Sequence, residues 1–218
     1  RTERRATEAA DQAGKTANGR LGYGVTPLFS PDRQALNDML KRHRVWVHSG
    51  HGHHKAGITV VGKVGNNYKA VAFKASDITD NDLDYDLVFM NTCESTDTKY
   101  VPYWNATEQN CPGWDGPYAY TDGTAVLDIG YRLNAKNYVG WDCEVKRQLS
   151  VGIPKMLMQE LDSTGTLPED RRTVGQAVGA VWNKLQIENP RRSYWYYGER
   201  LNAYRTDGII LDLNEKPF

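Results

Sequence analysis

The chain has 218 residues, enough to bury a substantial core, and is most simply a single domain spanning residues 1–218. Its 27 basic and 27 acidic residues cancel, and it has no basic tract, so charge gives no support for binding nucleic acid or a membrane surface. No apolar run approaches the roughly 20 residues of a membrane-spanning helix. We therefore expect neither nucleic acid nor a membrane span among its partners.

Three cysteines are too few for a disulfide framework, and their pairing is open. One interpretation pairs Cys111 with Cys143 in an oxidising compartment and leaves Cys93 as a thiol. The glycosylation acceptor pattern at Asn105-Ala106-Thr107 would suit such a secreted or cell-surface protein. The alternative is three reduced thiols in a cytoplasmic protein. Because the chain starts at Arg1 without a signal peptide, we expect a processed or truncated piece of a longer protein.

The N-terminal part of the chain predicts a helix followed by a strand–helix–strand unit. Residues 2–15 are charged and rich in Ala, which favours an exposed helix, and residues 21–28 can form a short strand. Ser30-Pro31-Asp32 predicts the start of a second helix, with the Ser30 hydroxyl as its cap and Pro31 in its first turn. A strand at 44–48 would complete a βαβ unit, which belongs to a parallel sheet.

The middle of the chain predicts a hairpin and a second buried strand. Residues 58–62 and 68–73 flank a turn signal at Gly65-Asn66-Asn67, as in a β-hairpin. Residues 76–83 predict a short capped helix, and an apolar strand follows at 87–91.

The rest of the chain begins with a long segment at 94–123 that has little periodicity, and we expect it to be functional and to fold over a substrate. Beyond it, helices are predicted at 124–135, 145–161 and 173–187, and strands at 137–141, 194–197 and 209–213. Pro154 should kink or delay the regular part of its helix. This alternation of strand and helix favours an α/β sheet with crossover helices.

Two apolar runs end in small-residue turns that carry reactive side chains. The first is Val45-Trp46-Val47-His48-Ser49-Gly50-His51-Gly52, and the second is Leu87-Val88-Phe89-Met90-Asn91-Thr92-Cys93-Glu94-Ser95. Chemistry in parallel sheets gathers beyond the carboxyl ends of the strands. We therefore expect His51 and Cys93, 42 positions apart, to lie side by side at the tips of neighbouring strands. A histidine beside a cysteine is the smallest set of side chains with which a thiolate can act as a catalytic nucleophile.

The histidine cluster makes a metal-dependent hydrolase the competing hypothesis. All the histidines lie in one short stretch, namely His43, His48, His51, His53 and His54. The turn is similar in part to that of metallo-β-lactamase-like hydrolases, but it lacks the Asp before the last His, and the chain has no HExxH helix and no paired CxxC. We therefore expect no metal and no cofactor.

Each member of the pair also has a simpler interpretation. His51 alone would be a surface-loop histidine, and Cys93 alone would be a small buried hydrophobe, as most such cysteines are. Their joint occurrence at the ends of two predicted strands favours a catalytic dyad.

The pattern of strand then His51-Gly52, and strand then Thr92-Cys93, resembles the caspase, gingipain, clostripain, legumain and separase group of cysteine peptidases (clan CD). Ser49-Gly50-His51-Gly52 is similar to a segment of gingipain-like and CHAT-type members. Further similar segments lie at 135–141, 173–185 and 196–199, so that the resemblance covers about residues 20–213. The Gln-Ala-Cys-x-Gly signature of caspases is absent, and Asn91 stands where metacaspases carry an acidic residue, so the likeness is to the broad superfamily.

The resemblance implies a three-layer α/β/α sandwich with a mostly parallel central sheet. The usual first strand is missing from the pattern, which implies a sheet that is either truncated or completed by a partner chain. It further implies an endopeptidase acting on peptide or protein substrates: Cys93 forms a thioester acyl-enzyme, and His51 protonates the leaving amine and then activates water. The backbone N–H of Gly52, with that of Cys93, would form the oxyanion hole.

The same resemblance implies that the strand after the cysteine lines the specificity pocket. Trp141 would then be a wall of the pocket, and Asp142 would anchor a Lys or Arg before the scissile bond. A core Trp and an ordinary turn Asp are equally open interpretations of these two residues. A catalytically silent caspase-like domain that only binds partners would keep the fold and lose the chemistry.

Overall fold

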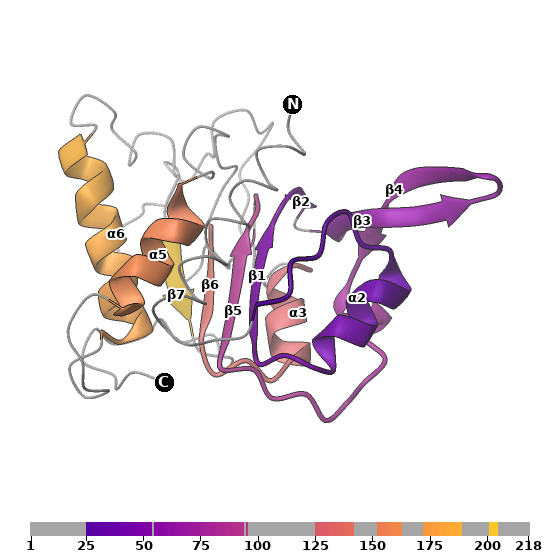
Figure 1. The fold of residues 1–218 in the computed structure, drawn as a ribbon, viewed down its shortest axis with the longest axis horizontal. Coiled ribbons are helices and arrows are strands. Elements are labelled where there is room, and N and C mark those ends of the chain that lie inside the picture. The colour runs from indigo at the N-terminus through magenta and orange to yellow at the C-terminus, as the bar shows by residue number, and fades with distance from the viewer. Residues whose placement is uncertain are drawn as a thin grey trace.

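The protein is an α/β structure built on a mostly parallel sheet (Figure 1). The computed structural model describes residues 25–53, 55–93, 95, 125–141, 152–162, 172–188 and 201–204. The strand order of the main sheet is β1 (Val45–Ser49), β5 (Leu87–Asn91), β6 (Tyr138–Trp141) and β7 (Leu201–Tyr204). β1, β5 and β6 run parallel, and β7 is antiparallel to β6. The predicted mostly parallel α/β sheet is confirmed.

The central strand β5 is buried along its whole length, as expected of a parallel strand with both faces covered. Leu87 and Phe89 pack on one side with helices α5 (Ile153–Asp162) and α6 (Val174–Glu188). Val88 and Met90 pack on the other side, toward α2 (Arg33–Leu40) and α3 (Leu127–Arg132). Figure 1 shows these two pairs of helices on opposite sides of the sheet. A continuous apolar run is therefore what this position requires.

Helix α2 begins two residues later than a Ser30 cap would place it. The cap is Asp32, whose side chain accepts a hydrogen bond from the Ala35 N–H at 2.8 Å. Ser30 has a φ of 45°, in the left-handed region, whereas a cap residue needs extended backbone. The predicted strand at 21–28 is wrong for residues 25–28, which form no strand, and its first residues lie outside the described part.

The predicted hairpin is confirmed as part of a separate antiparallel sheet. This sheet consists of β2 (Gly52–His53), β3 (Gly57–Val64) and β4 (Asn67–Phe73), in that order. Gly65, with a φ of 62°, supplies the left-handed conformation that the tight turn needs. The hairpin projects from the body of the molecule (Figure 1). The base of the hairpin packs into the core, where Ile58 and Phe73 are buried.

The capped helix predicted at 76–83 is wrong. Only a 3₁₀ turn forms there, η1 (Ala75–Asp77). The following backbone pairs with α2 instead, because the buried Asn37 side chain donates to the Asp77 carbonyl at 2.9 Å and accepts from the Thr79 N–H at 3.1 Å. A tertiary contact has thus replaced the local helical bonds.

Two C-terminal helices form where helices are predicted. α5 matches the later part of the helix predicted at 145–161 and has Pro154 in its first turn, whereas residues 145–151 lie outside the described part of the chain. α6 matches the helix predicted at 173–187, and the buried Glu160 of α5 pairs with Lys184 of α6.

The remaining C-terminal predictions differ from the structure or are not covered by it. α3 is shorter than predicted. β7 was not predicted. The strands expected at 194–197 and 209–213 lie outside the described residues. The segment 94–123 also lies outside them, except for Ser95. Within the described part of the chain, no helix is long and apolar enough to cross a membrane.

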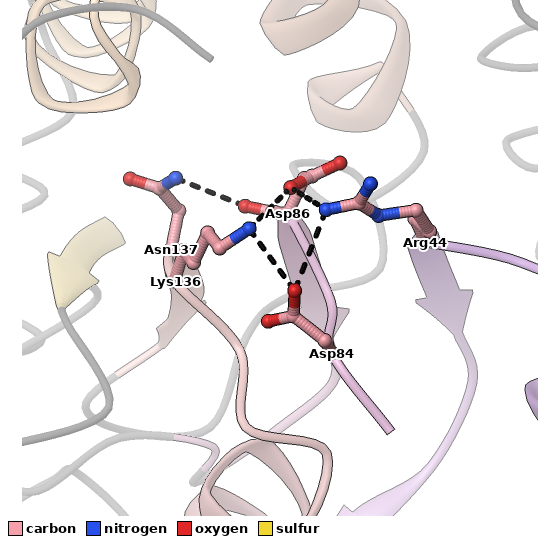
Figure 2. A network of polar contacts seen from close by, with 5 residues as sticks. All are labelled: Arg44, Asp84, Asp86, Lys136 and Asn137. Atoms are coloured by element: carbon pink, nitrogen blue, oxygen red, sulfur yellow. Dashed lines mark hydrogen bonds and ion pairs between the residues drawn. The ribbon is translucent and has the colours of Figure 1, made fainter. Parts of the chain in front are cut away.

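A polar network joins the amino-terminal ends of the three parallel strands (Figure 2). Arg44, before β1, lies 2.9 Å from Asp86, before β5, and Lys136, before β6, lies 3.2 Å from the same carboxylate. The Asn137 side chain donates to the Asp86 carbonyl at 2.9 Å. Hydrogen bonds from Lys136 to Asp84 and Asp86 raise the pKa of its ammonium group. Because Arg44, Asp84 and Lys136 are well exposed, each ion pair adds little stability, but together they align the strands at the end opposite His51 and Cys93.

Candidate active site

The register of β1 and β5 brings the two predicted residues to the same edge of the sheet. Paired residues of these strands, from Val45 with Leu87 to Ser49 with Asn91, are 42 positions apart. The same offset separates His51 from Cys93, so each lies two residues beyond the last pair. The Gly50 N–H donates to the Asn91 carbonyl at 3.4 Å and carries the contact one residue past the strand end.

The two turns then meet at Gly52. A Cβ built on Gly52 would lie 2.3 Å from Oγ1 of Thr92 and 2.9 Å from the carbonyl oxygen of Cys93. Such distances leave no room for any side chain at position 52. The family resemblance gives one reason for a glycine at position 52, which is that a substrate carbonyl would have to approach its backbone N–H. The structure adds a second reason, which is that the cysteine turn packs directly against it.

Both side chains of the predicted dyad lie within reach of solvent. His51 is exposed, and the Cys93 thiol is partly buried. The backbone of His51 is held by the Thr59 N–H of β3, which donates to its carbonyl at 2.9 Å. The hairpin therefore supports the histidine turn from the side away from β5.

His48 lies beneath this turn with its Nε2 atom shielded from water. The residue as a whole is only partly buried, but its Nε2 atom is buried and has no hydrogen-bond partner among the described residues. The ring packs edge-on to Trp46, with centroids 6.0 Å apart, and a Cβ on Gly50 would come within 2.9 Å of it. Burial, and secondarily the charge of His51, lowers the pKa of His48 to about 4. His48 is thus neutral at neutral pH.

The other histidines do not converge on a metal site in the described part of the chain. The His43 ring contacts the Met39 carbonyl at 2.9 Å and the Thr26 hydroxyl at 3.1 Å. The His53 Nδ1 accepts from the Lys55 N–H at 3.2 Å, and His54 lies outside the described residues. Among the described residues, no group of three or more His, Cys, Asp or Glu side chains could hold a metal ion.

Trp141 is a core residue in this structure. It is 1% exposed, packs with α5 and α6, and donates its indole N–H to Oδ1 of Asn91 at 3.0 Å. Asn91 in turn donates to the Ser49 hydroxyl at 3.0 Å, so side chains link the ends of β1, β5 and β6. Of the two interpretations of Trp141, burial favours the core residue over the pocket wall. Asp142, Cys111, Cys143 and Asn105 lie outside the described residues.

The sequence analysis missed two residues that shape this edge, Ser95 and Thr92. Ser95 is 0% exposed and bonds to the main chain of Trp141. Thr92 is also 0% exposed, and its hydroxyl has no hydrogen-bond partner among the described residues. Small polar residues are common in any turn, so no local signal distinguishes these two from ordinary turn residues.

No protein-family model matches the chain, and a comparison with curated proteins finds no match.

Proposed function

We propose that this chain is a cysteine endopeptidase with a caspase-like three-layer α/β/α fold, in which His51 and Cys93 form the catalytic dyad. The observation that carries the proposal is the register of the two strands. β1 and β5 are parallel neighbours whose pairing offset equals the separation of the two residues. Helices on both sides of the sheet agree with the layered fold that the sequence resemblance implies.

The reaction uses one nucleophile and one proton carrier. The Cys93 thiol gives its proton to His51 as its sulfur attacks the scissile carbonyl carbon, and His51 passes this proton to the leaving amine as the carbon–nitrogen bond breaks. A water molecule, deprotonated by His51, then attacks the thioester, which releases the carboxylic acid, and His51 returns the proton to the Cys93 sulfur to regenerate the thiol. The N–H groups of Gly52 and Cys93 would stabilise the oxyanion formed in each step.

The surroundings of the dyad support a reactive role. Buried polar side-chain atoms nearly always find a hydrogen-bond partner. In the described part of the chain, the two exceptions are His48 Nε2 and Thr92 Oγ1, and both lie within a few residues of the dyad. A neutral His48 also adds no positive charge beside His51 at neutral pH.

The test combines hydrolysis with labelling. The protein is incubated with a mixed peptide library, and separately with a peptidyl acyloxymethyl ketone that alkylates an active-site thiol. We expect cleavage and labelling by the wild type, and a loss on the order of a thousandfold or more in cleavage by Cys93→Ala and His51→Ala. His53→Ala is the matched control, because it removes an exposed imidazole from the same turn and should retain activity.

Two outcomes would contradict the peptidase. A folded wild type that neither cleaves nor labels would favour the partner-binding domain, and hydrolysis that survives in Cys93→Ala but stops with a chelator would favour the metal-dependent hydrolase.

A preference for Lys or Arg before the scissile bond is a further part of the proposal and depends on Asp142. Asp142→Asn should reduce cleavage after basic residues far more than cleavage after neutral ones, with little change in stability. Equal losses on both kinds of substrate would argue against this anchor.

A further inference from the structure

We propose that Ser95 is the positioning residue of the nucleophile. It clamps the turn that carries Cys93 onto the end of β6 and thereby holds the thiol beside the histidine turn. This inference deepens the proposed function and rests on it.

Every polar group of Ser95 has a hydrogen-bond partner, although the residue is 0% exposed. Its N–H donates to the Trp141 carbonyl at 2.9 Å, and its own carbonyl accepts from the Tyr138 hydroxyl at 2.7 Å. The Ser95 hydroxyl accepts from the Trp141 N–H at 2.8 Å and lies 2.9 Å from two acceptors, the carbonyls of Met90 and Thr92. The hydroxyl thus works as donor and acceptor at once.

These bonds enclose Cys93. Thr92 immediately precedes it, and Ser95 follows it by two residues, so the bond from the Ser95 hydroxyl to the Thr92 carbonyl closes the turn around the cysteine. The bond to Met90 ties the same turn back to the last part of β5. The cysteine is therefore held from both sides along the chain.

Ser95 also replaces β5 as the partner of β6 at this end of the sheet. β5 pairs with β6 through two residue pairs, Val88 with Tyr138 and Phe89 with Val139. At Trp141, two residues further along β6, the main-chain N–H and carbonyl bond to Ser95 instead. The turn is thereby anchored to a buried strand, while Gly52 packs against its other side.

A hydroxyl is needed at this position because water cannot replace it. Alanine would remove the acceptor of the Trp141 N–H and the single O–H donor that the Met90 and Thr92 carbonyls share, in a place without access to solvent. We expect the turn to shift or to sample several conformations. A displacement of about 1 Å at a reacting group can cost on the order of a hundredfold in rate.

The test compares Ser95→Ala with a control that loses a similar bond elsewhere. Thr173 is 4% exposed and its hydroxyl accepts from the Gln176 N–H at 3.1 Å at the start of α6, so Thr173→Ala removes a buried hydroxyl from a different element. Both variants should melt a few degrees below the wild type. Ser95→Ala alone should lower kcat by about tenfold to a hundredfold with KM changed by less than about twofold, and should slow iodoacetamide alkylation of Cys93 across the pH range. Ser95→Thr, which retains the hydroxyl, should recover most of kcat.

The possible results distinguish a wrong positioning role for Ser95 from a wrong peptidase assignment. If the wild type cleaves peptides and Ser95→Ala matches Thr173→Ala in kcat and in alkylation rate, the positioning role is wrong and the peptidase stands. If the wild type shows neither cleavage nor labelling, the peptidase itself is wrong. Should Ser95→Ala fail to fold, Tyr138→Phe removes only the bond to the Ser95 carbonyl, and an unchanged kcat in that variant would overturn the inference.

Discussion

Gly52 and Thr92 lie so close together that a Cβ on Gly52 would be 2.3 Å from Oγ1 of Thr92. Gly52 is the first residue of β2 and directly follows His51, and Thr92 belongs to the turn after β5. The two turns that carry His51 and Cys93 are therefore in direct contact. This contact depends on a residue without a side chain, and it can be tested by adding a single methyl group.

Gly52→Ala should lower both stability and activity. The added methyl group must displace the Thr92 side chain and press on the Cys93 carbonyl, and forced overpacking of this kind typically costs about 1–3 kcal/mol. We expect urea unfolding to show that loss, and kcat/KM for peptide cleavage to fall about tenfold or more because the cysteine turn moves. Gly152→Ala is the matched control, since a Cβ there meets none of the described residues within 4 Å. Equal stability and activity in the two variants would contradict the packing argument.

His48 should make the protein less stable in mild acid. Its pKa is about 4 in the folded protein against 6.5 in the unfolded chain, so between these values the unfolded chain binds the additional proton. The contribution of His48 to the free energy of unfolding is fully present above pH 6.5. It is lost as the pH drops toward 4, which lowers the free energy of unfolding by up to about 3 kcal/mol. His48→Leu should flatten that part of the curve. The measurement is urea unfolding at several pH values from 4.5 to 8, and parallel curves for the two proteins would rule out His48 as the cause.

Trp141→Phe separates the two interpretations of this residue. As a core residue, Trp141 should contribute mainly to stability, and the variant should lose about 1–3 kcal/mol because the bond to Asn91 and part of the packing disappear. The preference for the residue before the scissile bond should stay as in the wild type. Thermal unfolding and a cleavage profile over a peptide library measure both. A changed preference at unchanged stability would show that Trp141 lines the pocket after all.

Gly130→Ala should destabilise the protein although it improves a helix. Intrinsic propensity alone would favour Ala within α3 by up to about 1 kcal/mol. However, a Cβ on Gly130 would lie 2.4 Å from Cδ2 of Tyr138, the residue that donates to Ser95. We expect a net loss of about 1–3 kcal/mol in chemical unfolding, because the buried ring has little room to move. A variant as stable as the wild type would mean that α3 can shift on the sheet.

Local patterns predicted most of the regular elements correctly. The apolar runs of β1 and β5 and the hairpin of β3 and β4 all follow from residue type and spacing. The predictions that failed concern segments whose structure depends on contacts with distant parts of the chain. Asn37 of α2 binds the backbone after η1, so the helix expected there is replaced by long-range hydrogen bonds. The antiparallel strand β7 has a partner, β6, more than fifty residues away in the chain.

By itself, the sequence determined that two buried strands end in small-residue turns, one with His51 and the other with Cys93, because strand formation and turn chemistry depend on neighbouring residues. Only the tertiary structure decided that these strands are parallel neighbours whose register aligns the two turns. It also decided that Trp141 is buried and that Ser95 holds the cysteine turn. The physical reason is that register, burial and these hydrogen bonds join residues more than forty positions apart, and such contacts leave no periodic trace in the sequence.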